Sequence, residues 1–270
     1  YLSFKEREVF MFRLMFVLFL LSPFTSHAQV NIENQRSGKK GFLTTVTVGS
    51  QLKKGNSDVF DLKSSLRLDH NTQHNHFFIL TDYEYGQSNG EDYKGSKFYH
   101  VRNTYRFLRG LEGVLHKSNL GVEGFTQYQS NVFSDLELRQ LLGFGLRYEE
   151  VDDRGVKVSA RDVYAFGLAG MLEYESLISG EEGGLSLRMT SYISFRKTTE
   201  GKNAFFLVAY FQPKVLNLKD FRVLSECGVE FKLSRNAFIR NAFQFNYDSR
   251  PPTEIEKYDL SNLVSLKLDW

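Results

Sequence analysis

The most constraining feature of this sequence is a period of two in hydrophobicity, which recurs from about residue 40 to the C-terminus. In 136–148 the even-numbered positions are mostly apolar, and the odd-numbered positions are mostly charged residues or glycine. Successive side chains of a β-strand point to opposite faces, so this segment is predicted to be a strand with one apolar and one polar face. The pattern returns in 223–233, 239–247 and 260–270, which predicts an all-β chain.

Turn residues between the alternating segments divide the chain into about twelve predicted strands. Their ranges are 42–52, 58–70, 76–86, 97–109, 114–128, 135–149, 162–175, 185–196, 204–213, 220–233, 236–248 and 259–270. Most are about 10 to 15 residues long, whereas strands of soluble sheets average about 5–6 residues and transmembrane strands need about 9–11. The lengths predict an antiparallel transmembrane β-barrel, and an even strand count places both termini on the periplasmic side.

The connections between strands give a second indication of orientation. External connections of outer-membrane barrels are usually longer than periplasmic turns. We expect 87–96 and 249–258 to be external loops, and 71–75, 110–113 and 234–235 to be periplasmic turns. The segment 151–161 is long for a periplasmic turn, so a strand boundary there is uncertain. In 205–211 both faces are apolar, and the outward side of that strand cannot be assigned.

Aromatic residues of the apolar rows gather at the predicted strand ends. Amphipathic rings prefer the boundary between membrane and water, and barrels carry one aromatic girdle at each interface. The outer ends hold Tyr85, Tyr99, Tyr128, Tyr174 and Tyr247, and the inner ends hold Phe107, Tyr148, Phe195 and Trp270.

The polar rows are predicted to face the barrel interior. A soluble, lipocalin-like barrel would reverse the faces and enclose the apolar rows, but the long strands and the aromatic girdles favour the membrane arrangement. The predicted lumen-lining residues are Asp82, Glu84, Arg102, Arg106, Glu123, Arg139, Arg147, Glu226, Glu230 and Arg240. Interleaved charges of this kind suit either a filter for small polar solutes or a salt-bridged plug.

An apolar run near the N-terminus predicts export. Met11 and Arg13 precede the apolar run 14–21, and Ser26-His27-Ala28 provides small residues at both outer positions of a cleavage site. These are the parts of a secretory signal peptide. We expect translation to start at Met11 and cleavage to follow Ala28, so that 1–28 comprise upstream residues plus the signal peptide and 29–270 form the barrel.

Composition excludes several other classes of protein. Aromatic residues make up 15% of the chain, which argues against disorder. The formal net charge of +2 gives no reason to expect a nucleic-acid partner. Cys227 is the only cysteine, so a disulfide framework and a cysteine-based metal site are excluded. Nucleotide-binding and zinc-protease motifs do not occur, and no cofactor or metal is predicted.

Three segments together resemble a known family. They are 49–57 in the first predicted hairpin, 138–148 in the middle of the chain, and 246–252 followed by Asp259 near the end. Their sequences resemble the YdiY-like family of salt-induced outer-membrane proteins, whose function is not known. The resemblance spans nearly the whole predicted mature chain. It implies a barrel in the outer membrane of a Gram-negative cell and carries over no catalytic residue.

Histidines are the residues on which a hydrolase hypothesis depends. His70, His74 and His76 cluster near a predicted periplasmic turn, where ordinary polar roles are favoured over metal binding. His100 shares the polar row with Asp82 and Glu84 near the outer ends of their strands. A catalytic pair of His100 with an acid is one reading, and a hydrogen-bond network in the lumen is favoured over it.

The sequence therefore predicts a non-catalytic outer-membrane barrel, serving as a narrow pore for small polar solutes or as a structural or stress-related envelope protein. Its expected partners are outer-membrane lipid and the barrel-assembly machinery, which we expect to recognise a last strand ending at Trp270. Two alternatives are an outer-face hydrolase of lipid or peptide, and an exported soluble β-domain that binds a ligand. The alternation does not define the oligomeric state.

Overall fold

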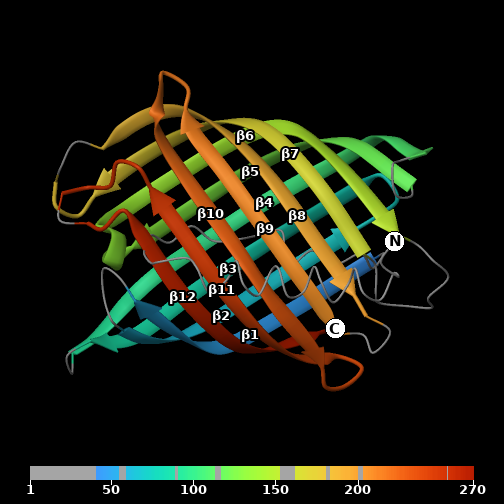
Figure 1. Ribbon diagram of the computed structural model, residues 1–270, viewed down its shortest axis with the longest axis horizontal. Coiled ribbons are helices and arrows are strands. Elements are labelled where there is room, and N and C mark those ends of the chain that lie inside the picture. The colour runs from blue at the N-terminus through green and yellow to red at the C-terminus, as the bar shows by residue number, and fades with distance from the viewer. Residues whose placement is uncertain are drawn as a thin grey trace, which may run out of the picture.

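The strands close into a single barrel (Figure 1). The computed structural model describes residues 41–54, 59–88, 91–112, 117–152, 162–180, 183–199, 203–253 and 255–270. The predicted signal peptide and the segment 153–161, on which one uncertain boundary depends, lie outside the described residues. No helix in the described part of the chain is long and apolar enough to cross a membrane.

Twelve strands form the barrel, as the alternation predicts. They are β1 (Gly41–Lys54), β2 (Val59–Asn71), β3 (Asn75–Ser88), β4 (Glu91–Glu112), β5 (Lys117–Asn131), β6 (Leu136–Asp152), β7 (Asp162–Leu177), β8 (Gly184–Thr198), β9 (Ala204–Lys214), β10 (Asn217–Lys232), β11 (Ala237–Asp248) and β12 (Tyr258–Asp269). A short 3₁₀ turn, η1 (Val132–Ser134), connects β5 to β6. Most strand ends fall within three residues of the predicted ones.

Each strand pairs antiparallel with its neighbours in the chain, and β1 pairs with β12 to close the sheet. At this seam the backbone N–H of Thr44 donates to the carbonyl of Trp270 at 3.0 Å, and the N–H of Trp270 donates back at 2.8 Å. Closure leaves no row of unpaired backbone groups, which a membrane-spanning sheet requires. We call the end of the barrel that carries the β11–β12 connection the outer end, because an even strand count places the chain termini at the periplasmic end.

One predicted loop is wrong. The segment 87–96 is mostly strand, because β3 continues to Ser88 and β4 begins at Glu91. The 22 residues of β4 make it the longest strand of the barrel. Gly and Asn in 86–90 suggested a long loop, but the two strands stay paired as far as Ser88 with Glu91. The β11–β12 connection is a loop, as predicted.

Burial alternates along the strands and shows which face lies inside. In β6 the side chains of Leu142 and Phe144 are 63% and 66% exposed on the outer surface, whereas Arg147 is 2% exposed in the interior. The polar rows therefore face inward, and the soluble arrangement with the apolar rows inside is wrong. In β9 the even-numbered Phe206, Val208 and Tyr210 point inward, which resolves the strand that the sequence left unassigned.

Candidate functional site

The interior of the barrel, or lumen, contains the predicted lumen-lining residues in several separate groups. Nine of the ten are at most 9% exposed, and Arg106 is half-buried. Arg139 belongs to a charged network at the outer end, and the guanidinium of Arg106 lies 3.8 Å from Glu149 on the neighbouring wall. Arg102, Glu123 and Arg147 meet near the middle of the lumen. The remaining carboxylates pair with lysines and arginines of an adjacent strand or of the next strand beyond it.

Those remaining pairs join strands that are at most two positions apart in the barrel. Lys63 lies 3.7 Å from Asp82 and 3.3 Å from Glu84. Arg240 pairs with Glu226 on the adjacent strand. Glu230 accepts from Arg196 at 2.7 Å and from Lys267 at 3.4 Å. Buried charges are tolerated where such partners replace the water that folding removes.

A layer of apolar side chains crosses the lumen between these charged groups. It consists of Phe78, Leu80, Phe98, Tyr192, Val208, Tyr210 and Leu224, and we call it the aromatic layer. Its members come from β3 and β4 on one wall and from β8, β9 and β10 on the other, with β5, β6 and β7 lying between them in the barrel order. Contact between them therefore spans the lumen, and the layer constricts it.

Glycines in the walls provide the space that the rings occupy. A Cβ added at Gly143 would collide with the ring of Phe125, and one added at Gly167 would collide with the ring of Tyr192. Each glycine faces the interior, so a large side chain of the adjacent strand can lie flat over it. The small-to-large pairing lets aromatic side chains fill a barrel without pushing its walls apart.

Arginines stack on several of the interior rings. The guanidinium of Arg67 lies 3.7 Å from the ring centroid of Phe78, and that of Arg240 lies 4.2 Å from Phe206. Arg102 lies 4.9 Å from the centroid of Phe125. Cation–π contacts that are shielded from water are worth about 2 kcal/mol, so the charged and aromatic parts of the lumen stabilise each other.

The hydroxyl of Tyr192 fixes the aromatic layer in place. It donates to the carboxylate of Glu123, at 2.9 and 3.0 Å from its two oxygens, and accepts from Arg147 at 2.7 Å. Arg102 donates to the same carboxylate at 3.2 Å. Because Tyr192 lies on β8 and Glu123 on β5, these bonds hold the ring across the lumen. Beside it only about 20 Å³ of space remains, enough for about one water molecule.

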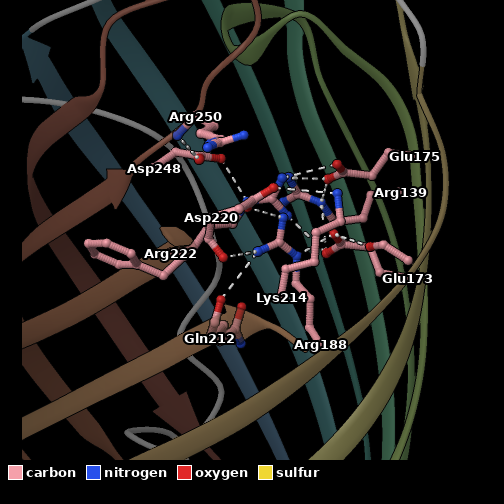
Figure 2. A network of polar contacts seen from close by, with 12 residues as sticks. Arg139, Glu173, Glu175, Arg188, Gln212, Lys214, Asp220, Arg222, Asp248 and Arg250 are labelled. Carbon is pink, nitrogen blue, oxygen red and sulfur yellow. Dashed lines mark hydrogen bonds and ion pairs between the residues drawn. The ribbon is translucent and has the colours of Figure 1, made fainter. Parts of the chain in front are cut away.

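The outer end of the lumen holds a continuous set of ion pairs (Figure 2). We call it the outer charged network, and it consists of Arg139, Glu173, Glu175, Arg188, Lys214, Asp220, Arg222 and Asp248. These residues come from six consecutive strands, β6 to β11. The network therefore connects one half of the barrel wall by side chains as well as by the backbone ladder.

Arg222 is the centre of this network. Its guanidinium donates to Glu173 at 2.9 Å, to Glu175 at 3.0 Å and to Asp248 at 2.7 Å. Arg188 also binds Glu173, at 2.7 Å, and reaches Asp220 at 2.9 Å. Arginine suits this position because its planar group presents five donors in a fixed geometry.

A cavity of about 210 Å³ adjoins the outer charged network. Arg139, Arg188 and Arg222 line it from the strands, and Arg250 and Pro252 line it from the β11–β12 connection. It is ten times larger than the space beside Tyr192 by the same measure. The described lumen is thus wide and charged at the outer end and narrow at the aromatic layer.

His100, on which the hydrolase hypothesis depends, lies among aromatic rings. The ring of His100 is stacked among the rings of Phe78, Phe98 and Phe125, with centroids 5.6 to 6.0 Å apart. Asp82, the acid proposed for it, faces Lys63.

Near the periplasmic end, His76 bonds Asp69 at 2.7 Å inside the barrel. His70 stacks on Phe42 on the opposite face of the sheet. Within the described residues, no group of three or more His, Cys, Asp and Glu side chains is arranged so that it could hold a metal ion.

The aromatic layer is the part of the site that sequence reasoning missed. Phe78 and Leu80 share the inward row with Asp82 and Glu84, but the charged residues defined that row as polar. A signal was present, because the even-numbered residues of 78–84 change from apolar to acidic along one face. Such a change within one row predicts layers in the lumen rather than a uniformly polar wall.

The fold is similar to solved outer-membrane barrels. The NanC porin shares 8% identity with this chain, with a TM-score of 0.53 over 83% of this chain and 98% of the porin. The COG4313 outer membrane channel from Pseudomonas putida F1 shares 12% identity, with a TM-score of 0.48 over 90% of this chain and 100% of the channel. No curated protein matches the chain. A family model matches residues 46–270, and the chain belongs to that family, described as "Protein of unknown function, DUF481".

Proposed function

We propose that this chain is a non-catalytic integral protein of the outer membrane, in which small polar solutes follow a narrow lumen constricted by the aromatic layer. The observation that carries the proposal is the change in character along one closed interior: charged walls and a cavity at the outer end, and the apolar side chains of the aromatic layer further in. Hydrophobic constrictions between polar segments are a recurring way to limit conduction.

The proposal includes the route by which the protein reaches the membrane. A signal peptide cleaved after Ala28 would export the chain, and barrel-assembly machinery would recognise the last strand with its terminal Trp270. The similarity of 49–57, 138–148 and 246–252 to the YdiY-like family supports the same location. The exposed side chains of Leu142 and Phe144 support contact with lipid.

Insertion of a charge on the outer surface tests the membrane assignment. Leu142→Arg should make folding into the bilayer less favourable by about 2–4 kcal/mol, because Leu142 lies mid-strand on the exposed face. Leu142→Met keeps an apolar side chain and is the control. The measurement is the difference in gel migration between unheated and boiled outer-membrane fractions. Normal assembly of Leu142→Arg would contradict the proposed lipid contact.

Truncation of the aromatic layer tests the constricted pathway. Phe98→Ala removes a ring that is 1% exposed in the lumen, whereas Phe144→Ala removes a ring on the lipid face and is a matched control. In planar bilayers Phe98→Ala should raise the single-channel conductance above the wild-type level, and Phe144→Ala should leave it unchanged. Equal conductance of the two variants would show that the layer does not limit passage.

A structural role in the envelope is the second candidate, and the outer charged network favours it. Ion pairs that link six strands would strengthen a barrel whether or not solutes pass. The same bilayer experiment separates the two roles, because a structural barrel should show no conductance in the wild type or in Phe98→Ala.

A further inference from the structure

The outer cavity has a charged lining that differs from the apolar constriction on which the proposed pathway depends. We propose that it binds a small organic carboxylate, such as a sugar acid. The inference rests on the proposed function in one respect: a bound carboxylate would be a solute at the entrance of the lumen.

Positive charge predominates among the described residues that line the cavity. The cationic side chains are Arg139, Arg188, Lys214, Arg222 and Arg250. The carboxylates are Glu175, Asp220 and Asp248. Glu173 accepts from Arg188 and Arg222 but does not itself line the cavity. Low-dielectric walls concentrate the potential of such an excess, so the cavity attracts an anion.

Two of the cations form fewer ion pairs than the others. Within the described residues, the guanidinium of Arg250 makes no ion pair, and only its backbone N–H donates, to Asp248 at 2.9 Å. Figure 2 shows Arg250 at the edge of the network beside Asp248. In the part of the chain that the structure describes, Lys214 forms one ion pair, with Asp220 at 3.4 Å, and its side chain is 36% exposed. These groups can bind a new anion without breaking the contacts of Arg222.

The chain around Arg250 holds it over the cavity. Pro251 follows it and disfavours a helical backbone at Arg250, and Ser249 and Arg250 form a bend. The N–H of Asp248 donates to the carbonyl of Lys257 at 2.7 Å, which closes the base of the same connection. A cation at the end of an anchored connection loses less conformational entropy on binding than one on a free loop.

Apolar residues in the same lining distinguish an organic acid from a bare ion. Leu136, Leu177 and Pro252 also line the cavity. A carboxylate could pair with Arg250 and Lys214 while its carbon skeleton covers this apolar surface. The volume of about 210 Å³ suits a molecule of a few heavy atoms up to a single sugar ring and excludes a long chain.

Calorimetric titration of the folded full-length barrel in detergent tests the inference, with glucuronate as the probe and glucose as its neutral analogue. Glucuronate should bind and glucose should not. Arg250→Gln and Lys214→Gln should each weaken glucuronate binding about tenfold, the loss expected for one hydrogen bond to a charged group. Lys219→Gln removes the same charge from an exposed site of the adjacent β10 outside the cavity lining, and should leave the affinity unchanged.

Absence of glucuronate binding, equal binding of glucose, or equal loss in Lys219→Gln would each overturn the inference. A heat-dependent shift in gel migration verifies that every variant is folded. The titration needs no conducting lumen. A barrel that binds glucuronate without conducting would therefore contradict the proposed pathway and support the carboxylate site. A barrel that conducts without binding glucuronate would support the pathway and contradict the carboxylate site.

Discussion

The aromatic layer and the outer charged network fill the same lumen by different physical means. The layer joins opposite walls, β3 and β4 to β8–β10, through apolar contact that depends on the fit of rings over glycines. The network joins six neighbouring strands on one side through directional ion pairs. The layer joins opposite walls, whereas the network stays on one side even where Arg222 on β10 reaches past two strands to Glu173 and Glu175 on β7. The space beside the layer is about 20 Å³ and that beside the network about 210 Å³, so the layer is the narrower region.

The difference also concerns how each region responds to loss of one side chain. A ring removed from the layer leaves space that neighbours or water can fill, at a cost that depends on how far the site relaxes. Removal of a guanidinium from the network leaves buried carboxylates without their counter-charge. Rearrangement of the neighbouring side chains does not replace that charge. The network should be the more sensitive region for stability, and the layer the more sensitive region for conduction.

The largest expected effect is the loss of Arg222. Arg222→Met should lower the free energy of unfolding by about 3–5 kcal/mol, because three carboxylates lose a buried partner. Urea titration of the barrel folded into phospholipid vesicles measures it. Arg222→Lys keeps the charge without the planar fork and should lose less. If both variants were as stable as the wild type, the network would not be a stabilising element.

An intermediate effect is expected for the hydroxyl of Tyr192. Tyr192→Phe removes the bonds to Glu123 and Arg147 but keeps the ring. It should cost about 1.5–3 kcal/mol, the range for hydrogen bonds to charged groups, while conductance stays at the wild-type level. A large rise in conductance would show that the hydroxyl, rather than the ring, maintains the constriction.

The smallest effect is expected at the rim of the network. Lys214→Ala removes one ion pair whose lysine is partly exposed. The loss in the free energy of unfolding should be below about 1 kcal/mol, since water screens such pairs. The same urea titration measures it beside Arg222→Met. A loss as large as that of Arg222→Met would mean that the exposed ion pairs of the network stabilise the barrel as much as the buried ones.

Alternation along the chain was enough to predict the architecture. It predicted the number of strands, the closed antiparallel barrel and the inward direction of the polar rows. Leu142 and Arg147 illustrate the pattern, because they are five positions apart and lie on opposite faces of β6. The strand structure of 87–96 could not be predicted in this way. Pairing between β3 and β4 outweighs the local preference of glycine and asparagine for turns there.

The sequence by itself determined which residues face the outside of the barrel and which face the lumen, because the period of a β-strand depends only on local geometry. Only the tertiary structure decided which inward side chains meet. Tyr192 and Glu123 are separated by 69 residues, and their contact depends on barrel closure and on the relative position of strands that are not neighbours. The constriction, the outer charged network and the cavity beside Arg250 all arise from that long-range arrangement, which no local pattern encodes.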